Sequence, residues 1–315
     1  MDSFAGRCRI VAFFVLLGSA TLAGSVGGQE AAKQEAEHCF LWKVSSKTTT
    51  LFLLGSMHVG RADFFPLPKE IEDAFASSKT LVVEVDTSGL DQAKLQKLIF
   101  EKGLYPAGEK LSKNVSKKTM SLLEKYCAKK KLEVADFESI RPWMLALLLS
   151  VEELKALGLT EDKGIDKHFE AKANAKATKK RVIELETADA QIELFAGLAP
   201  ELQEQTLAKL LVESGDLKKQ MEVMIVTWKT GDGKAMAKAL TDSVKDHPEF
   251  KPLMVKMFDD RNVKMTDKIV SLLREKESCF VMVGAGHLVG EKGIVKLLAD
   301  KGYQVEQVKR AAAKK

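Results

Sequence analysis

The chain has 315 residues, 45% of them hydrophobic and 30% charged, which is the composition of a globular protein. That composition excludes a wholly disordered chain, a collagen and a small disulfide-rich domain, for which four cysteines are too sparse. The net charge of +5 lies at the ends: residues 1–28 carry +1, residues 309–315 carry +4, and residues 29–308 sum to zero. A neutral body argues against a nucleic-acid-binding protein, because such proteins cluster Lys and Arg against the phosphates.

The first 28 residues have the pattern of a secretory signal peptide. Arg7 and Arg9 precede the apolar run Ile10–Leu17, and small residues follow as far as Gly28. An uncleaved membrane anchor is the alternative, but residues 10–26 are short for a span and contain several Gly, Ser and Thr. We therefore expect an exported protein, periplasmic or secreted, that has no membrane span after cleavage. The expected divisions are a signal peptide over 1–28, a linker over 29–38, a folded domain over 39–308 and a disordered basic tail over 309–315.

Three cysteines remain after such a cleavage. It removes Cys8 and leaves Cys39, Cys127 and Cys279. An odd number in an exported protein indicates an unpaired thiol or an intermolecular disulfide. The alternative is three buried thiols that pack as small hydrophobic side chains.

Strands and one helix open the expected folded domain. Aromatic and β-branched residues predict strands over Cys39–Ser45 and Thr50–Leu54, joined by a polar turn. A helix is expected over Pro68–Ser78, because proline favours the first position of a helix. Thr80–Val85 is an apolar run of strand length and predicts a buried strand.

Helical periodicity dominates the middle of the chain, and strands return near its end. The short segment Arg181–Leu185 predicts a strand within the helical region, and Cys279–Val283 and Tyr303–Val308 predict the last two strands. This order predicts an α/β (α+β) fold in which N- and C-terminal strands form one central mixed sheet with a large helical insert. The expected helices are Asp91–Glu101, Ser116–Lys130, Pro142–Leu157, Ile165–Lys179, Ala188–Leu198, Glu201–Lys229, Gly233–Ser243, Arg261–Lys276 and Glu291–Lys301.

Two Gly-x-x-His motifs directly follow expected strands. One runs from Gly55 to His58, and the other runs from Gly284 through Gly286 to His287. A single motif of this kind is usually a tight turn with a solvent-facing histidine. Because ligands gather at the carboxyl ends of strands in sheets flanked by helices, however, the pair predicts two imidazoles in one site.

Carboxylates occur in the same setting. Glu84 and Asp86 end the strand Thr80–Val85 and are expected to point to one face, and Glu184 and Glu186 end the next strand. A buried Glu84 needs a partner, since an unpaired charge is costly inside a protein. Two histidines with one or two carboxylates are typical ligands of a hydrolytic divalent metal. The alternative is a metal-free site in which His or Glu acts as general base on water.

Arg261 and Asn262 follow two aspartates at the start of an expected helix. Arg261 is a candidate for binding a substrate carboxylate or an oxyanion, and the alternative is a simple helix start. Three other histidines, His38, His168 and His247, are expected to be structural or exposed.

Together these segments resemble the TraB/GumN family, which includes PrgY and the animal Tiki proteins. The resemblance covers most of residues 39–308, and the two Gly-x-x-His motifs with a Glu between them are its most specific mark. The segments that carry it are LFLLGSMHVG (51–60), TLVVEVD (80–86), GIDKHF (164–169), KRVIELETADAQIELF (180–195), DDRNVKM (259–265) and CFVMVGAGHLVGEKGIVKLLADKGYQVEQV (279–308).

The resemblance implies an EreA/ChaN-like fold and a metal-dependent hydrolase of the peptidase type, acting on a peptide or a small amide or ester. The implied metal is of the manganese or cobalt type, with zinc as an alternative. His58, His287 and Glu84 would be the metal-binding and catalytic residues, and Arg261 would assist catalysis. Supporting positions are Asp86, Asp166, Glu186, Asn262, Gly55, Gly284 and Gly286.

The same resemblance implies a second function. TraB and PrgY relatives are linked to blocking peptide signals, and ChaN-like relatives to haem. The alternative is therefore a non-catalytic protein that binds a peptide signal or haem in the same cleft.

Overall fold

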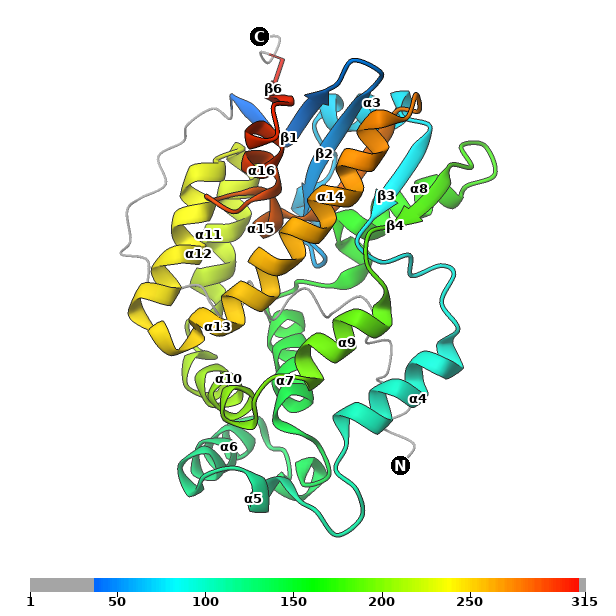
Figure 1. Ribbon diagram of the computed structural model, residues 1–315. Helices are drawn as coiled ribbons and strands as arrows, with labels where there is room; N and C mark the ends of the chain where they lie inside the picture. The colour runs from blue at the N-terminus through cyan, green and yellow to red at the C-terminus, as the bar shows by residue number, and fades with distance from the viewer. Residues whose placement is uncertain (1–36, 312–315) are drawn as a thin grey trace. The chain divides into compact units, whose positions relative to one another are not determined.

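The computed structural model describes residues 37–311 and shows a mixed α/β fold with one six-stranded sheet (Figure 1). The expected signal peptide, the linker up to residue 36 and the end of the basic tail, residues 312–315, lie outside the described residues. Two compact units are present. One comprises Thr87–Leu157 and Ala188–Lys218, and the other comprises the described residues of 37–86, 158–187 and 219–311.

The sheet has the strand order β4-β3-β5-β2-β1-β6. Strands β4, β3, β5 and β2 run parallel, whereas β1 is antiparallel to both β2 and β6. The predicted central mixed sheet of N- and C-terminal strands is therefore confirmed. Its strands are β1 (His38–Ser45), β2 (Thr50–Ser56), β3 (Thr80–Val83), β4 (Arg181–Glu184), β5 (Cys279–Gly284) and β6 (Gln304–Lys309).

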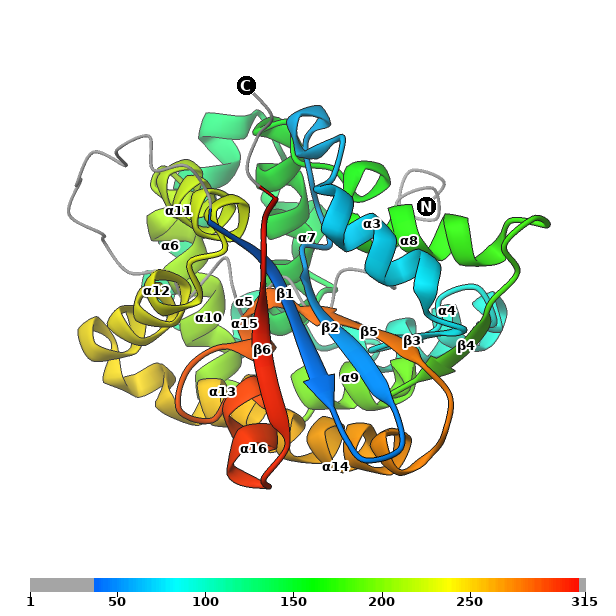
Figure 2. The ribbon, with the colours of Figure 1, turned by 90° about the horizontal axis from the view of Figure 1, so that it is seen from above.

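Helices cover both faces of the sheet. Helices α3 (Lys69–Ser77) and α8 (Ile165–Asn174) lie on one face, and α14 (Asp260–Arg274) and α16 (Ile294–Asp300) lie on the other (Figure 2). On the first face, Phe280 of β5 packs against Phe75 and Phe169, with ring centroids 5.4 and 5.0 Å away. Every residue of β3 and β5 is buried, which explains why these strands are continuous apolar runs rather than alternating patterns.

The sheet-containing unit also holds helices that precede α14 and follow β5. A π-helical segment, Val255–Asp259, leads directly into α14, and the second Gly-x-x-His motif ends in the short helix α15 (Ala285–Leu288) rather than in an open turn. The remaining helices here are α12 (Gly233–Asp246), α13 (Lys251–Met254) and most of α11 (Leu217–Thr230).

The other unit contains helices and no named strand among its described residues. Asp91 and Ser116 cap α4 and α6 with their side chains, and Pro142 opens the almost fully buried α7, which ends before Gly158 at φ +75°. The single helix expected over 201–229 is wrong, because the chain turns at Ser214–Asp216 and forms two helices. The helices of this unit are α4 (Gln92–Gly103), α5 (Leu111–Asn114), α6 (Lys117–Lys130), α7 (Pro142–Ala156), α9 (Ala188–Ala196) and α10 (Pro200–Glu213).

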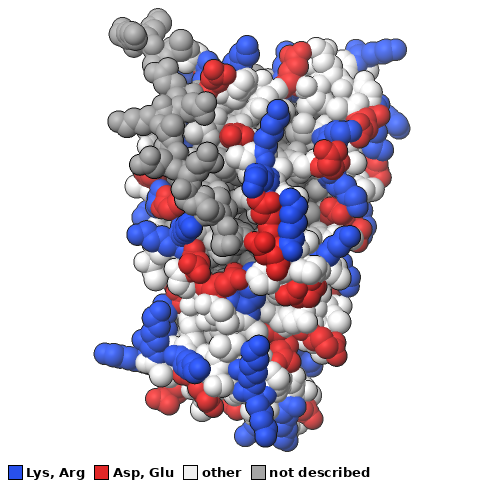
Figure 3. All heavy atoms as spheres, turned by 90° about the vertical axis from the view of Figure 1, so that its left-hand side faces the viewer, with Lys and Arg blue, Asp and Glu red and all other residues white. Residues whose placement is uncertain are grey.

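The three cysteines among the described residues are buried and free. None of the helices in residues 37–311 has the length and apolar character needed to cross a membrane. On the face shown in Figure 3, Lys and Arg side chains are interspersed with Asp and Glu among the described residues.

Candidate active site

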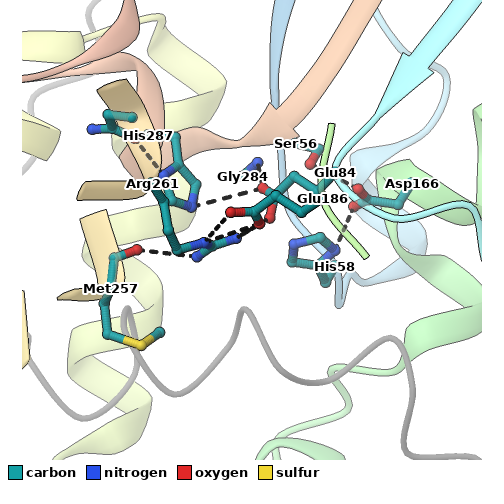
Figure 4. A network of polar contacts seen from close by, with 10 residues as sticks. Ser56, His58, Glu84, Asp166, Glu186, Met257, Arg261, Gly284 and His287 are labelled. Carbon is teal, nitrogen blue, oxygen red and sulfur yellow. Dashed lines mark hydrogen bonds and ion pairs between the residues drawn. The ribbon is translucent and has the colours of Figure 1, made fainter. Parts of the chain in front are cut away.

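The carboxyl ends of three parallel strands bring the predicted site residues together. His58 follows β2, Glu84 follows β3, and His287 lies directly after β5, all in the sheet-containing unit. Arg261 reaches the same place from α14 (Figure 4). The structure therefore places both Gly-x-x-His motifs around one carboxylate, at the edge of the sheet where ligands bind in folds of this class.

Glu84 is buried and fully engaged by donors. Its side chain is 5% exposed; Oε2 accepts a hydrogen bond from Arg261 Nη2 at 2.6 Å, and Oε1 accepts one from the Gly284 backbone N–H at 2.6 Å. Burial raises the pKa of Glu84, but His287, Arg261, His58 and the Gly284 N–H lower it more, to about 2. Glu84 is therefore ionised at neutral pH, which resolves how a carboxylate is tolerated at the end of an apolar strand.

Arg261 connects two carboxylates to the backbone before α14. Nη2 donates to Glu84 and, at 2.6 Å, to Glu186; Nε also donates to Glu186 at 3.0 Å. Nη1 donates to the carbonyl oxygen of Met257 at 3.0 Å. Met257 lies in the π-helical segment, a type of helix distortion that is frequent at functional sites. Four of the five N–H groups of Arg261 thus hold this cluster in place.

His58 forms an ion pair with Asp166. His58 Nδ1 lies 3.2 Å from Asp166 Oδ2, and Ser56 Oγ donates to Asp166 Oδ1 at 2.9 Å. Burial lowers the pKa of His58, but Asp166, Glu84 and Glu170 outweigh it and raise the pKa to about 9. His58 is therefore cationic at neutral pH in the metal-free protein.

Two close backbone contacts bring His58 to Asp166. A Cβ added at Gly60 would lie 2.1 Å from the carbonyl oxygen of Lys163, and one added at Gly164 would lie 2.2 Å from that of His58. Gly60 also exchanges two backbone hydrogen bonds with Thr160, both 3.0 Å long. Glycine at 60 and 164 lets the loop after β2 touch the start of α8, where Asp166 lies in the first turn.

His287 is held by α14 and the preceding segment. Its Nδ1 lies 2.6 Å from Asn262 Oδ1, and Asn262 Nδ2 donates to the carbonyl oxygen of Lys292 at 2.9 Å. The Phe258 ring packs on the imidazole at a centroid distance of 5.1 Å. Burial and Arg261 lower the pKa of His287 to about 3, against the opposing effect of Glu84, so this imidazole is neutral at pH 7.

Each of these two imidazoles leaves one nitrogen unsatisfied. Among residues 37–311, Nε2 of His58 and Nε2 of His287 are buried without a hydrogen-bond partner. His287 Nε2 lies 3.8 Å from Glu84 Oε1, too long for a hydrogen bond. Within the same described range, no group of three or more His, Cys, Asp or Glu side chains has the closeness that metal binding needs. The two orphaned nitrogens are nevertheless the donor type that divalent transition metals prefer, so the residues present fit such an ion in chemistry.

The other predicted site residues have more modest positions. The backbone N–H of Asp86 donates to Glu184 Oε2 at 3.3 Å. An added Cβ at Gly55 would lie 2.4 Å from the Phe40 ring, and one at Gly286 would lie 2.8 Å from the Phe258 ring. These two glycines therefore make room for aromatic side chains of the core, whereas Gly284 contributes its N–H to Glu84.

The three histidines expected to be structural or exposed have local contacts. His168 Nε2 lies 2.8 Å from Glu72 Oε1, and His247 Nδ1 lies 3.3 Å from Glu249 Oε1. His38 begins β1, opposite Lys309 of β6.

Sequence reasoning missed several residues that support the cluster. Trp228 of α11 donates from Nε1 to the carbonyl oxygen of Gly55 at 2.6 Å and stacks on Phe64 at 5.7 Å. Met257 and Lys292 contribute only their backbone carbonyls, for which a sequence carries no signal. Ser56 could have been found, because it lies inside the first Gly-x-x-His motif.

Comparison with known proteins places the chain in a family. The model of the TraB/PrgY/gumN family matches residues 40–307. Uncharacterized protein YbaP of Escherichia coli (strain K12) is 25% identical over 249 residues, covering 78% of this chain and 86% of YbaP. YbaP of Shigella flexneri matches with the same identity and coverage. No solved structure matches the chain. The family model spans both Gly-x-x-His motifs, Glu84 and Arg261, and the chain therefore belongs to the TraB/PrgY/gumN family.

Proposed function

We propose that this chain is a hydrolase of the peptidase type, which cleaves an amide or ester bond at the cluster of His58, Glu84, Arg261 and His287. One observation carries the proposal. Two imidazoles, one partly buried and one buried, lie near an ionised carboxylate at the carboxyl edge of the sheet, and each has a buried Nε2 atom without a hydrogen-bond partner. A structural cluster would be expected to satisfy these atoms, whereas a hydrolytic site keeps them available.

A divalent metal is part of the proposal. His58 Nε2 and His287 Nε2 would hold it, with Glu84 as a carboxylate ligand or as the general base. The Nδ1 atom of each imidazole contacts an oxygen, of Asp166 or of Asn262, which is the usual arrangement around metal-binding histidines. When bound, a metal of the manganese, cobalt or zinc type polarises the scissile carbonyl and lowers the pKa of its bound water.

The protein's own residues supply orientation and charge. Arg261 and the Gly284 N–H hold Glu84 ionised and fixed in direction, so that it can accept a proton from water or bind a cation. Glu186 shares the Arg261 guanidinium with Glu84 and fixes its orientation. In this arrangement Arg261 acts mainly on Glu84, and any contact with a substrate oxygen is secondary to that role.

We also propose that the protein is exported. The support is the charged, apolar and small-residue order of residues 1–28. Mass spectrometry of the protein from its native host would show an N-terminus near residue 29. An intact Met1 would indicate an uncleaved anchor and contradict the proposal.

Metal content and turnover test the enzymatic proposal together. Purified wild type should retain a divalent metal by elemental analysis and cleave members of a peptide library, and chelation should abolish cleavage. A metal at 100 times its dissociation constant should stabilise the fold by about 2.7 kcal/mol, measured as a thermal shift.

Histidine variants localise the effect. His58→Ala and His287→Ala should lose bound metal, turnover and the thermal shift. His247→Ala is the matched control, since His247 contacts Glu249 and Phe250 of its own segment. Cleavage that survives both site variants would refute the proposal. A Soret band, or peptide binding without turnover, would instead support the non-catalytic alternative.

A further inference from the structure

We propose that Asn262 is a positioning residue that uses the backbone carbonyl of Lys292 to fix His287 with its proton on Nδ1 and its lone pair on Nε2. The consequence of this tautomer for metal binding rests on the proposed function. The tautomer itself follows from hydrogen bonding alone.

The orientation of the Asn262 amide is set by the Lys292 carbonyl, which lies on the side of the amide away from His287. Asn262 is 2% exposed, and its Nδ2 lies 2.9 Å from the Lys292 carbonyl oxygen. A carbonyl oxygen can only accept a hydrogen bond, so the NH₂ group of Asn262 must face it. The flipped amide would put two acceptors against each other in a buried place, which costs free energy.

The amide orientation in turn fixes the imidazole. With NH₂ facing Lys292, the Oδ1 atom faces His287 Nδ1 at 2.6 Å. An amide oxygen accepts but does not donate, so Nδ1 must carry the proton. In a neutral imidazole the other nitrogen then has the lone pair. This places the lone pair of Nε2 on the side of Glu84 Oε1, 3.8 Å away.

The opposite tautomer would disable the site. With its proton on Nε2, His287 would donate toward Glu84 Oε1 and have no lone pair there for a cation. Asn262 thus keeps an internal hydrogen bond between His287 and Glu84 from forming. The Lys292 carbonyl belongs to the main chain and is present whatever side chain the residue has. Through Asn262, it keeps Nε2 of His287 unprotonated and able to bind a metal ion.

The loop that carries this carbonyl also contacts the segment before α14 through an ion pair at the surface, which the carbonyl does not depend on. Lys292 Nζ pairs with Asp259 Oδ2 at 2.8 Å, and Asp259 ends the π-helical segment three residues before Asn262. Phe258, in the same segment, packs on the His287 ring. The loop after α15 and the start of α14 are thereby linked through both the backbone and the side chain of Lys292.

Nitrogen NMR of the histidine side chains tests the tautomer directly. The full chain, labelled with ¹⁵N-histidine and freed of metal, would be recorded at neutral pH, with His287→Ala used to assign the signals. We expect the proton of His287 on Nδ1 in wild type, and on Nε2, wholly or in part, in Asn262→Ala. Asn262→Asp keeps an acceptor at Nδ1, so Nδ1 should remain protonated in this variant.

A matched control separates the carbonyl from the ion pair. Lys292→Ala removes the contact with Asp259 but leaves the carbonyl, so the tautomer should not change. A wild-type spectrum with the proton on Nε2, or the same tautomer in wild type and Asn262→Ala, would overturn the inference. The wild-type measurement stands alone if a variant fails to fold.

A titration with Co²⁺ alone, followed by visible absorption, tests the consequence. Asn262→Ala should bind Co²⁺ about 10- to 100-fold more weakly than wild type, and Lys292→Ala should bind it within a few-fold of wild type. Equal Co²⁺ affinity in wild type and Asn262→Ala would count against the positioning role. If wild type binds no Co²⁺ but the tautomer changes in Asn262→Ala, the positioning role stands and the metal-dependent function fails.

Discussion

His58 and His287 occupy the same sequence motif, but their surroundings make them chemically opposite. His58 lies against the Asp166 carboxylate, and its pKa is raised to about 9. His287 lies against the neutral Asn262 amide and near Arg261, and its pKa is lowered to about 3. Without a metal, therefore, one imidazole is cationic and the other neutral at pH 7. Paired groups whose environments separate their pKa values are characteristic of catalytic sites.

These pKa values predict how the stability of the metal-free protein depends on pH. The folded-state pKa of His58 is raised from 6.5 to about 9, so its contribution is complete below pH 6.5 and is lost as the pH rises toward 9. The pKa values of His287 and Glu84 are lowered, to about 3 and about 2, so their contributions are lost as the pH falls below 6.5 and 4.5 respectively. Urea unfolding in the presence of a chelator should show maximal stability near pH 6.5.

A variant of His58 checks the alkaline side. His58→Gln should flatten the decline of the unfolding free energy between pH 6.5 and 9, which amounts to a few kcal/mol in wild type. A wild-type free energy of unfolding that rises across this interval would contradict the arrangement of His58 and Asp166.

Glu84→Gln separates the catalytic role of Glu84 from its structural role. The variant keeps the shape but removes the charge from a buried ion pair, so we expect a loss of about 1–3 kcal/mol in unfolding free energy. The loss stays moderate because Arg261 keeps Glu186 as a partner. Hydrolytic activity should fall at least 100-fold. The measurements are urea unfolding and turnover.

Glu184→Gln is the control, because Glu184 is an exposed carboxylate at the end of the neighbouring strand. It should change neither the unfolding free energy nor the turnover appreciably. A destabilised Glu84→Gln protein with wild-type turnover would remove Glu84 from the reaction.

The gathering of His58, Glu84 and His287 was predictable from sequence, because each directly follows an apolar strand and parallel strands end at one edge. The partners of these residues were not predictable. Arg261 was expected to meet a substrate, yet it binds Glu84, Glu186 and the Met257 carbonyl. Such contacts depend on the distance between helix α14 and the sheet, and local patterns contain no information on that distance.

At the scale of elements, strands were predicted more accurately than the way helices end. The predicted strand at 279–283 and the predicted helix starting at Pro142 agree with β5 and α7 within one residue at either end. The break at Ser214–Asp216 was missed, since apolar periodicity continues on both sides of it. The π-helical segment Val255–Asp259 was also missed, because its extra residue per turn leaves no compositional mark.

The close contact between the loop after β2 and the start of α8 gives a prediction at this scale. Gly164→Ala adds a Cβ where the His58 carbonyl oxygen lies 2.2 Å away, so the two backbones must separate. We expect a loss of about 1–3 kcal/mol in unfolding free energy, together with weaker metal binding as His58 moves from Asp166. Thermal unfolding and metal titration measure both effects.

Gly215→Ala is the matched control, because no atom lies within 4 Å of its added Cβ. Reduced backbone freedom in the unfolded chain should leave it as stable as wild type, or about 0.4–1 kcal/mol more stable. Wild-type stability and metal affinity in Gly164→Ala would show that the contact does not position His58.

At the scale of the whole molecule, all residues of the candidate site belong to the sheet-containing unit. The chain leaves this unit after Asp86 and again after Thr187 to form the helical unit. Sequence periodicity predicted the helical insert as part of one folded domain, because helices of both units have the same amphipathic patterns. Only the contacts formed in three dimensions divide them.

The positions of the thiols predict that the folded protein needs no disulfide. Cys39 is the second residue of β1 and precedes Leu41, which pairs with Leu54 near the end of β2. Cys279 pairs with Leu51 near the beginning of β2. The two cysteines therefore lie toward opposite ends of the sheet, too far apart for a disulfide. Cys127 is buried in the helical unit and is also free.

Their reactivity should be correspondingly low. Burial raises the pKa of Cys39 and Cys279 to about 11, so little thiolate exists at pH 8. A chain beginning at residue 29 should react with a thiol reagent such as Ellman's only after unfolding in guanidinium, and then at three thiols per chain. A reducing agent should leave its melting temperature unchanged. Rapid reaction of the folded protein, or a melting temperature lowered by the reducing agent, would contradict the burial and the free state of these cysteines.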